Sequence, residues 1–174
     1  ALKSKALQSP ARDAATLAEL DKAHAAFNQA MTLRKCYAEA AHNLGILLEA
    51  RGDLAAAHTS YSHALSWRPQ ALDTLTNFGN LLRKLGQSSA ALPLLEKADA
   101  LAANATTALN LALVKLDLAD YKGAMHDAQR ALNLDPDMLD ALASFGTAAR
   151  LDNDLERALP ALRKVADRSV AARL

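Results

Sequence analysis

Four stretches of the chain align on one another with spacings of 34, 33 and 34 residues. Two positions in each stretch carry a small residue. The first position holds Gly45, Gly79, Ala112 and Gly146, and the second, 12 residues later, holds Ala57, Ala91, Ala124 and Ala158. Because Gly and Ala allow two helix backbones to approach closely, their recurrence at a fixed period predicts an array of similar helical units.

Positions within each block are numbered from its first residue, which is Ala38, Leu72, Ala105 or Leu139. Residues at positions 4, 7, 8 and 11 form one mainly apolar stripe on a helix, which predicts a first helix of about 14 residues. At positions 15 and 16, Gly or Asn followed by Asp favours the end of that helix and the capped start of another. Each block is therefore predicted to be a helix hairpin, and the chain to be all-α without strands.

The full pattern has Leu-Gly or Phe-Gly at positions 7 and 8, Ala at 20 and 27, and Pro at 32. It resembles the tetratricopeptide repeat, and the stretch from Asn43 through Ala64 to Pro69 is the closest match. The resemblance implies an α-solenoid of antiparallel helix hairpins, a right-handed superhelix with repeats at 38–71, 72–104, 105–138 and 139–170. Lys115 departs from the pattern, because it occupies position 11, where a buried apolar residue is expected.

The two ends of the chain are less regular. Residues 1–37 are predicted to be a degenerate first repeat whose helix, from about Asp13 to Leu33, caps the array and brings the expected number of helices to at least nine. Ser169 to Leu174 resembles the entry to another helix, with residues 171–174 as a tail that continues in a longer protein. We expect the uncovered apolar face that includes Leu159 to promote homo-oligomer contacts, because repeat arrays need a polar terminal helix.

Composition and motifs exclude several classes of function. Twenty basic and 19 acidic residues leave a net charge of +1, so nucleic acid is not an expected partner. The single cysteine, the dispersed histidines and the lack of a Gly-rich phosphate loop or a nucleophile motif predict no metal, no cofactor and no catalytic site. No signal peptide or long apolar run is present, so we expect no membrane contact and a soluble, cytoplasmic protein.

The predicted binding surface is the side of each first helix that lies opposite its apolar stripe, namely positions 2, 6, 9 and 13. Asn recurs at position 6 in three successive blocks, although Asn is a weak helix former. The candidate residues are Asn43, Asn77, Asn110 and Ser144 at position 6, Asn80 and Thr147 at position 9, and Asp73 and Asp140 at position 2, with Arg83 and Arg150 beside them.

An Asn side chain offers an acceptor and two donors, so it can pair with the backbone of an extended peptide without reading its side chains. The recurrence is similar to the asparagine ladder in the tetratricopeptide arm of protein O-GlcNAc transferases. It predicts a scaffold that binds an extended segment of a partner protein. The alternative is a substrate-recognition arm of a larger enzyme, such as a protein glycosyltransferase.

A third possibility is a clamp for the C-terminal carboxylate of a chaperone, which tetratricopeptide repeats build from Lys, Arg and Asn. At the clamp positions this chain offers His42 and Asn77 but not the cations. The clamp is therefore disfavoured, because a bound carboxylate would have no charge-assisted partner.

Overall fold

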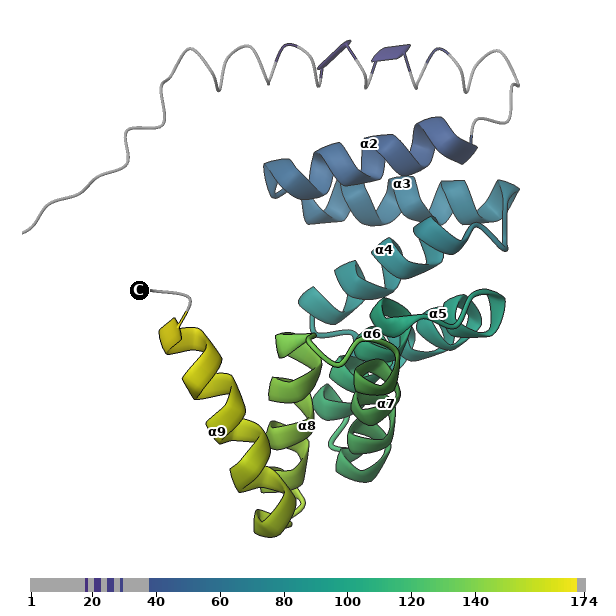
Figure 1. The fold of residues 1–174 in the computed structure, drawn as a ribbon. Coiled ribbons are helices and arrows are strands. Elements are labelled where there is room, and N and C mark those ends of the chain that lie inside the picture. Colours follow the sequence, from purple (N-terminus) through teal and green to yellow (C-terminus); the bar gives the residue numbers. More distant parts are fainter. Residues whose placement is uncertain (1–17, 19–20, 23–24, 27–28, 30–37, 172–174) are drawn as a thin grey trace, which may run out of the picture. The chain divides into compact units, whose positions relative to one another are not determined.

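The structure, a computed structural model, describes residues 38–171 together with 18, 21, 22, 25, 26 and 29 (Figure 1). The described part contains eight bounded helices and no strand. They are α2 (Ala38–Arg51), α3 (Leu54–Trp67), α4 (Leu72–Lys84), α5 (Ser88–Leu101), α6 (Ala105–Asp117), α7 (Tyr121–Leu134), α8 (Leu139–Leu151) and α9 (Leu155–Ala171). The earlier described residues are helical, but the rest of the helix predicted from Asp13 to Leu33 lies outside the described residues.

The helices pair as hairpins in the order that the period predicts. The first helix of each hairpin begins at Ala38, Leu72, Ala105 or Leu139, which are the first residues of the four blocks. The chain divides into two compact units, Ala1–Pro69 and Gln70–Leu174. The first unit contains the hairpin α2–α3, and the second contains the hairpins α4–α5, α6–α7 and α8–α9.

In the three hairpins that have glycine at position 8, this residue meets the side chain at position 24. A Cβ atom added to Gly79 would lie 2.7 Å from the Leu95 side chain, and one added to Gly146 would lie 2.8 Å from Leu162. Neither distance leaves room for a methyl group. The predicted close approach of the two helices is confirmed, and position 24 supplies the contact that was not anticipated.

The turn inside each hairpin reverses the chain with a residue in the left-handed conformation. Gly52 and Gly86 have φ of 85° and 73°, which a residue without Cβ adopts without strain. The Asp after Gly52 then caps α3, because its carboxylate accepts a hydrogen bond from the Ala56 N–H at 3.2 Å. Asp120 caps α7 in the same way, accepting from Gly123 at 3.0 Å. These local bonds confirm the predicted breaks between helices.

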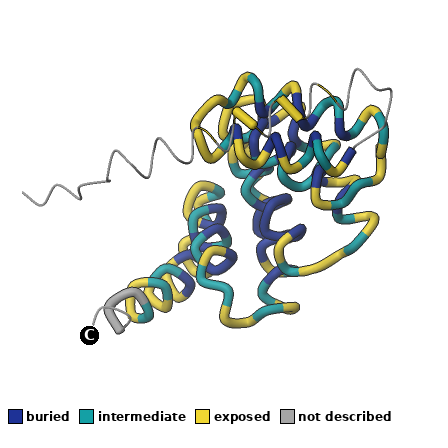
Figure 2. The backbone as a smooth tube through the Cα atoms, turned by 90° about the horizontal axis from the view of Figure 1, so that it is seen from above, coloured by how far each residue is buried: buried dark blue, intermediate teal, exposed yellow. Residues whose placement is uncertain are grey.

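Within the second unit, successive hairpins stack, so that α5 contacts α6 and α7 contacts α8. The first helices also contact one another, α4 with α6 and α6 with α8. The core between them is built largely from alanine, in two clusters centred on Ala108, Ala131 and Ala141 and on Ala124, Ala148 and Ala158. Figure 2 shows the buried residues alternating with exposed ones along the helices. Small side chains of this kind bring helices close together and leave little apolar area per residue.

The last helix differs from the prediction. α9 continues without a break to Ala171, so Ser169 to Ala171 extend it and do not begin a separate helix. Its later turns are held by Arg168, whose guanidinium donates to a carboxylate oxygen of Asp137 at 2.7 Å. No Pro follows to stop the helix at position 32, where Pro69 and Pro136 stand in blocks one and three, so the backbone is free to stay helical.

Candidate functional site

The four side chains at position 6 have different environments. Asn43, in the first unit, is exposed, and Asn77, in the second, is half-buried. Asn110 and Ser144, also in the second unit, are only 7% and 6% exposed. Two of the four position-6 side chains on the predicted binding surface are therefore buried.

Their burial follows from contacts between the first helices. α6 contacts both α4 and α8, so the side of α6 that faces away from α7 is still covered by protein. Ser144 satisfies its hydroxyl inside its own helix, donating to the Asp140 carbonyl at 2.7 Å. The side-chain amide nitrogen of Asn110 has no hydrogen-bond partner in the described part of the chain. An unsatisfied buried amide is unfavourable by about 1–3 kcal/mol.

The remaining predicted residues border these positions. Asn80 and Thr147 are half-buried, and Asp73, Asp140 and Arg150 are exposed. Arg83 is not a free cation, because its guanidinium lies 3.5 Å from the Asp117 carboxylate of α6. In the first unit the His42 ring lies against Tyr61, with 5.9 Å between ring centroids.

Tyr61 anchors the inside of the α2–α3 hairpin. Its ring is fully buried and its hydroxyl donates to the Glu49 carboxylate at 3.2 Å. Burial, and then the negative charge of Glu49, raise the pKa of the Tyr61 hydroxyl well above its usual range. The phenol therefore stays protonated and acts as a donor within the fold. In the first unit, His42, a residue of the predicted surface, thus packs on the buried Tyr61 ring.

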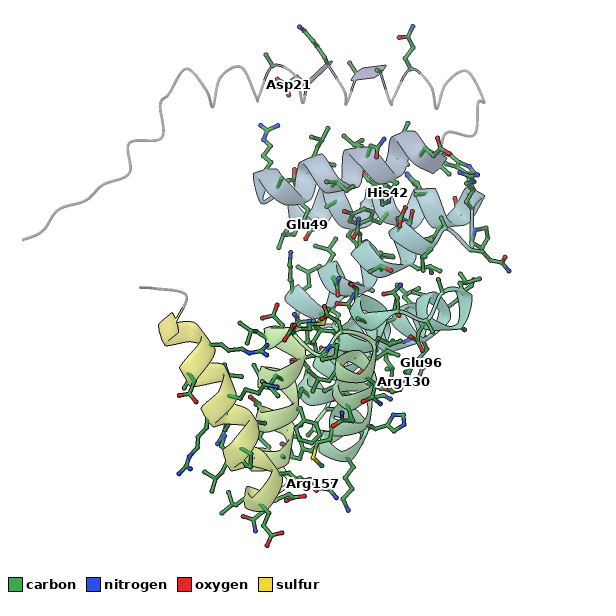
Figure 3. All side chains as sticks on the ribbon, in the orientation of Figure 1. Asp21, His42, Glu49, Glu96, Arg130 and Arg157 are labelled. Atoms are coloured by element: carbon green, nitrogen blue, oxygen red, sulfur yellow. The ribbon has the colours of Figure 1, made fainter. Side chains whose placement is uncertain are left out.

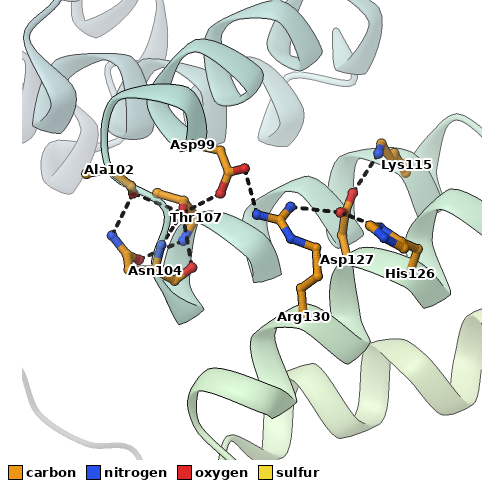
Figure 4. A network of polar contacts seen from close by, with 8 residues as sticks. All are labelled: Asp99, Ala102, Asn104, Thr107, Lys115, His126, Asp127 and Arg130. Carbon is orange, nitrogen blue, oxygen red and sulfur yellow. Dashed lines mark hydrogen bonds and ion pairs between the residues drawn. The ribbon is translucent and has the colours of Figure 1, made fainter.

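A polar network in the second unit was not predicted from the sequence (Figure 4). At its centre is Asp127 of α7, which is 2% exposed. Its carboxylate accepts hydrogen bonds from Lys115 at 2.6 Å and from Arg130 at 3.0 Å, and lies 3.1 Å from a ring nitrogen of His126. Arg130 also donates to Asp99 of α5 at 2.8 Å. Lys115 thus fits position 11 because Asp127, 12 residues later, supplies its counter-charge.

Burial alone would raise the pKa of Asp127, because it disfavours the charged form. The hydrogen bonds from Lys115, Arg130 and His126 outweigh burial and lower the pKa below the ordinary value for aspartate. Asp127 is therefore a carboxylate at neutral pH. Because its partners surround it inside the fold, the network serves to join α5, α6 and α7.

Two other kinds of site are missing from the residues that the structure describes. The described part of the chain contains no group of three or more His, Cys, Asp or Glu side chains that could hold a metal ion. No helix among the described residues has the length and apolar character needed to cross a membrane. The labelled side chains in Figure 3 include Arg130 and Arg157, which border an open hollow beside α7 and α9.

Comparison with known proteins identifies the repeat. A family model described as tetratricopeptide repeat matches residues 38–70 and 105–138, and a second model of the same description matches residues 71–98. No curated protein matches the chain.

Several solved structures are similar. A MamA RS-1 double mutant shares 26% identity with a TM-score of 0.75, covering 81% of this chain and 80% of that one. MamA from Desulfovibrio magneticus RS-1 shares 21% identity with a TM-score of 0.74, covering 87% and 96%. YrrB, described as a TPR protein with an unusual peptide-binding site, shares 24% identity with a TM-score of 0.80, covering 88% and 79%. The sequence period, the stacked hairpins and these matches agree, and the chain belongs to the tetratricopeptide-repeat family, with the α-solenoid fold of helix hairpins.

Proposed function

We propose that this chain is a protein-interaction module whose first helices hold an extended segment of a partner protein. The observation that carries the proposal is the buried amide nitrogen of Asn110, which has no partner among the described residues. Because this nitrogen is buried, the Asn110 side chain must turn outward before a carbonyl of a bound peptide backbone can satisfy it. Asn77 one block earlier and Ser144 one block later occupy the same position, so they supply polar groups at the same register.

The charge on this surface indicates which kind of partner segment would bind. Asp73 and Asp140 are exposed at position 2, while Arg83 is neutralised by Asp117. A basic or neutral segment would therefore approach more favourably than an acidic one. YrrB, which has a similar fold, is described as having a peptide-binding site, and this supports a peptide as the ligand class.

The test combines capture with substitution. A photo-crosslinking amino acid at Thr147, which is half-buried beside this surface, would trap the partner and identify the bound segment. A synthetic peptide of that segment is then titrated against wild type and the Asn77→Ala, Asn110→Ala double variant. Each neutral hydrogen bond contributes about 0.5–1.5 kcal/mol net, so two losses should weaken binding by about fivefold to 150-fold.

The melting temperature separates binding from folding. Asn110→Ala removes an unsatisfied buried donor and raises helix propensity, so the double variant should be at least as stable as wild type. Asn43→Ala is measured separately, because Asn43 belongs to the other unit. Unchanged affinity of the double variant would disprove the proposed role of the asparagines.

The alternative is that this chain selects substrates for a larger enzyme, such as a protein glycosyltransferase. In that case the same surface would bind the substrate protein and the catalytic groups would lie in another domain. The length of the full reading frame distinguishes an arm of an enzyme from a separate scaffold.

A further inference from the structure

A second surface of the molecule has the features of a docking site. An open hollow of about 810 Å³ lies in the second unit, bordered by α7, by the turn between α8 and α9, and by the start of α9. Met125 of α7 and Phe145 of α8 contribute its apolar atoms. Polar and charged side chains surround them, including Lys122, His126, Asp152 and Arg157. None of the asparagines proposed to bind the extended segment lines it.

Phe145 is more exposed than the equivalent residues of the other three blocks. It occupies position 7, and the other residues at this position are Leu44, Phe78 and Leu111, which are 3%, 8% and 4% exposed. Phe145 is only partly buried, although it packs on the same kind of alanine-rich core. The aromatic ring therefore presents apolar surface to the hollow, where the equivalent residues are enclosed.

The wall formed by α7 is basic. Lys122, His126 and Arg130 follow one another at intervals of four residues, so they lie on one side of the helix. The equivalent residues of α5 are Ser89, Pro93 and Lys97, so the fold does not require this stripe. Arg130 is neutralised by Asp99 and Asp127, whereas Lys122 has no ion-pair partner in the part of the chain that the structure describes.

The opposite edge carries both signs of charge. Arg157 lies 3.4 Å from the Asp154 carboxylate, which partly offsets its charge, and Asp152 lies at the same edge. A ligand carboxylate would therefore be drawn to the α7 side, toward Lys122. An adjacent apolar side chain would then lie over Phe145.

We propose that this hollow is a second docking surface, which binds an acidic segment of a partner protein by seating one large apolar side chain on Phe145 and pairing a neighbouring carboxylate with Lys122. The segment differs in charge from the basic or neutral one expected at the first helices. The two surfaces therefore discriminate between partners and allow the chain to join two proteins.

The test uses a fluorescein-labelled synthetic peptide in which one phenylalanine is flanked by aspartates, titrated against the full chain by anisotropy. Lys122→Glu should weaken binding by about three- to tenfold, and Phe145→Leu by a similar factor through loss of the aromatic contact. Leucine occupies position 7 in blocks one and three, so Phe145→Leu keeps the core filled. The matched control is Lys97→Glu, which makes the same charge change on α5, outside the hollow.

Selective loss with Lys122→Glu and Phe145→Leu, and not with Lys97→Glu, would support the site. Replacing the phenylalanine of the peptide by alanine should then reduce binding to the same extent as Phe145→Leu. Equal loss with Lys97→Glu would show general charge attraction, and absence of binding would show that the hollow takes no such segment; either result overturns the proposal. Loss of this binding in the Asn77→Ala, Asn110→Ala variant alone would also overturn it, since the peptide would then occupy the first helices.

Discussion

Blocks two and three have different kinds of side chain at the same two positions. At positions 11 and 23, block two has Leu82 and Leu94, whereas block three has Lys115 and Asp127. Leu82 is 4% exposed, and Asp127 is 2% exposed with the Lys115 ammonium 2.6 Å away. The backbone of the two hairpins is the same length and begins at the same block position. The pair of positions therefore accepts an apolar or an ionic contact, provided that both residues change together.

The pair of Lys115 and Asp127 belongs to a set of hydrogen bonds and ion pairs that leucines cannot form. Asp127 also binds Arg130, and Arg130 binds Asp99 on α5, so the network links block three to block two. Asp99 in turn accepts a hydrogen bond at 2.9 Å from Thr107, the third residue of the capped first turn of α6. The ionic pair thus serves the interface between blocks as well as the interior of one hairpin.

The largest expected effect comes from breaking only one half of the ionic pair. Lys115→Leu should destabilise the protein by about 3–5 kcal/mol, because Asp127 keeps a buried negative charge with one strong partner fewer. The double variant Lys115→Leu, Asp127→Leu copies block two and should be about as stable as wild type. Urea unfolding followed by circular dichroism measures both. A Lys115→Leu variant as stable as wild type would show that Arg130 alone is sufficient for Asp127.

A second test exchanges the residues at positions 8 and 24, which are Gly79 and Leu95 in block two and Ala112 and Ala128 in block three. Gly79→Ala should destabilise by about 1–3 kcal/mol, since its Cβ would lie 2.7 Å from Leu95. Adding Leu95→Ala creates the block-three pair and should be less destabilising than the sum of the single changes. Strict additivity in this double-mutant cycle would contradict the contact.

A smaller, pH-dependent difference should separate wild type from the double leucine variant. The pKa of Asp127 is lowered in the folded state, so its contribution is complete above the unfolded value of about 3.9 and is lost as the pH falls below that value through the lowered pKa. Wild type should therefore lose stability on acidification more steeply than the double variant. Urea midpoints at several acidic pH values report this, and parallel curves would exclude a titrating Asp127.

The smallest effect concerns blocks three and four at position 21. Met125 is 8% exposed where α8 follows, whereas Leu159 is 55% exposed and Leu155 of the same helix is 53% exposed. This contrast agrees with the expected self-association through α9, which stays a prediction. Leu159→Lys should reduce that association severalfold while changing the free energy of unfolding by no more than about 0.5 kcal/mol. Sedimentation of wild type as a monomer at high concentration would disprove it.

The sequence predicted those features that depend on residues close together in the chain. The helix starts, the break between helices at Gly52 and the Asp cap of α3 follow from local residue types, and the structure confirms them. Asn110 was predicted to lie on the binding surface, and its burial could not be inferred from its own helix, because α6 also contacts α4 and α8. The exposure of Phe145 could not be predicted from the sequence either. Phe78 is also a phenylalanine at position 7, and it is buried.

Lys115 is an intermediate case. As a single residue it contradicts the apolar pattern, and the contradiction disappears only when position 23 is compared across the blocks. That comparison would have found Asp127, since a buried cation needs a nearby anion. A departure from a repeat is therefore best examined together with the residues that pack against it.

The turns within the hairpins affect how the number of repeats can change in evolution. Each turn is closed by main-chain bonds that span no more than five residues, such as Asp53 N–H to the Leu48 carbonyl and Asp120 N–H to the Lys115 carbonyl. A gene segment that encodes one hairpin therefore carries everything needed to reverse its own backbone, and it can be duplicated or deleted as a whole. The turn also tolerates substitution of its glycine after such a duplication. Ala119 holds the left-handed conformation at φ 60°, at an expense of roughly 1–2 kcal/mol relative to glycine.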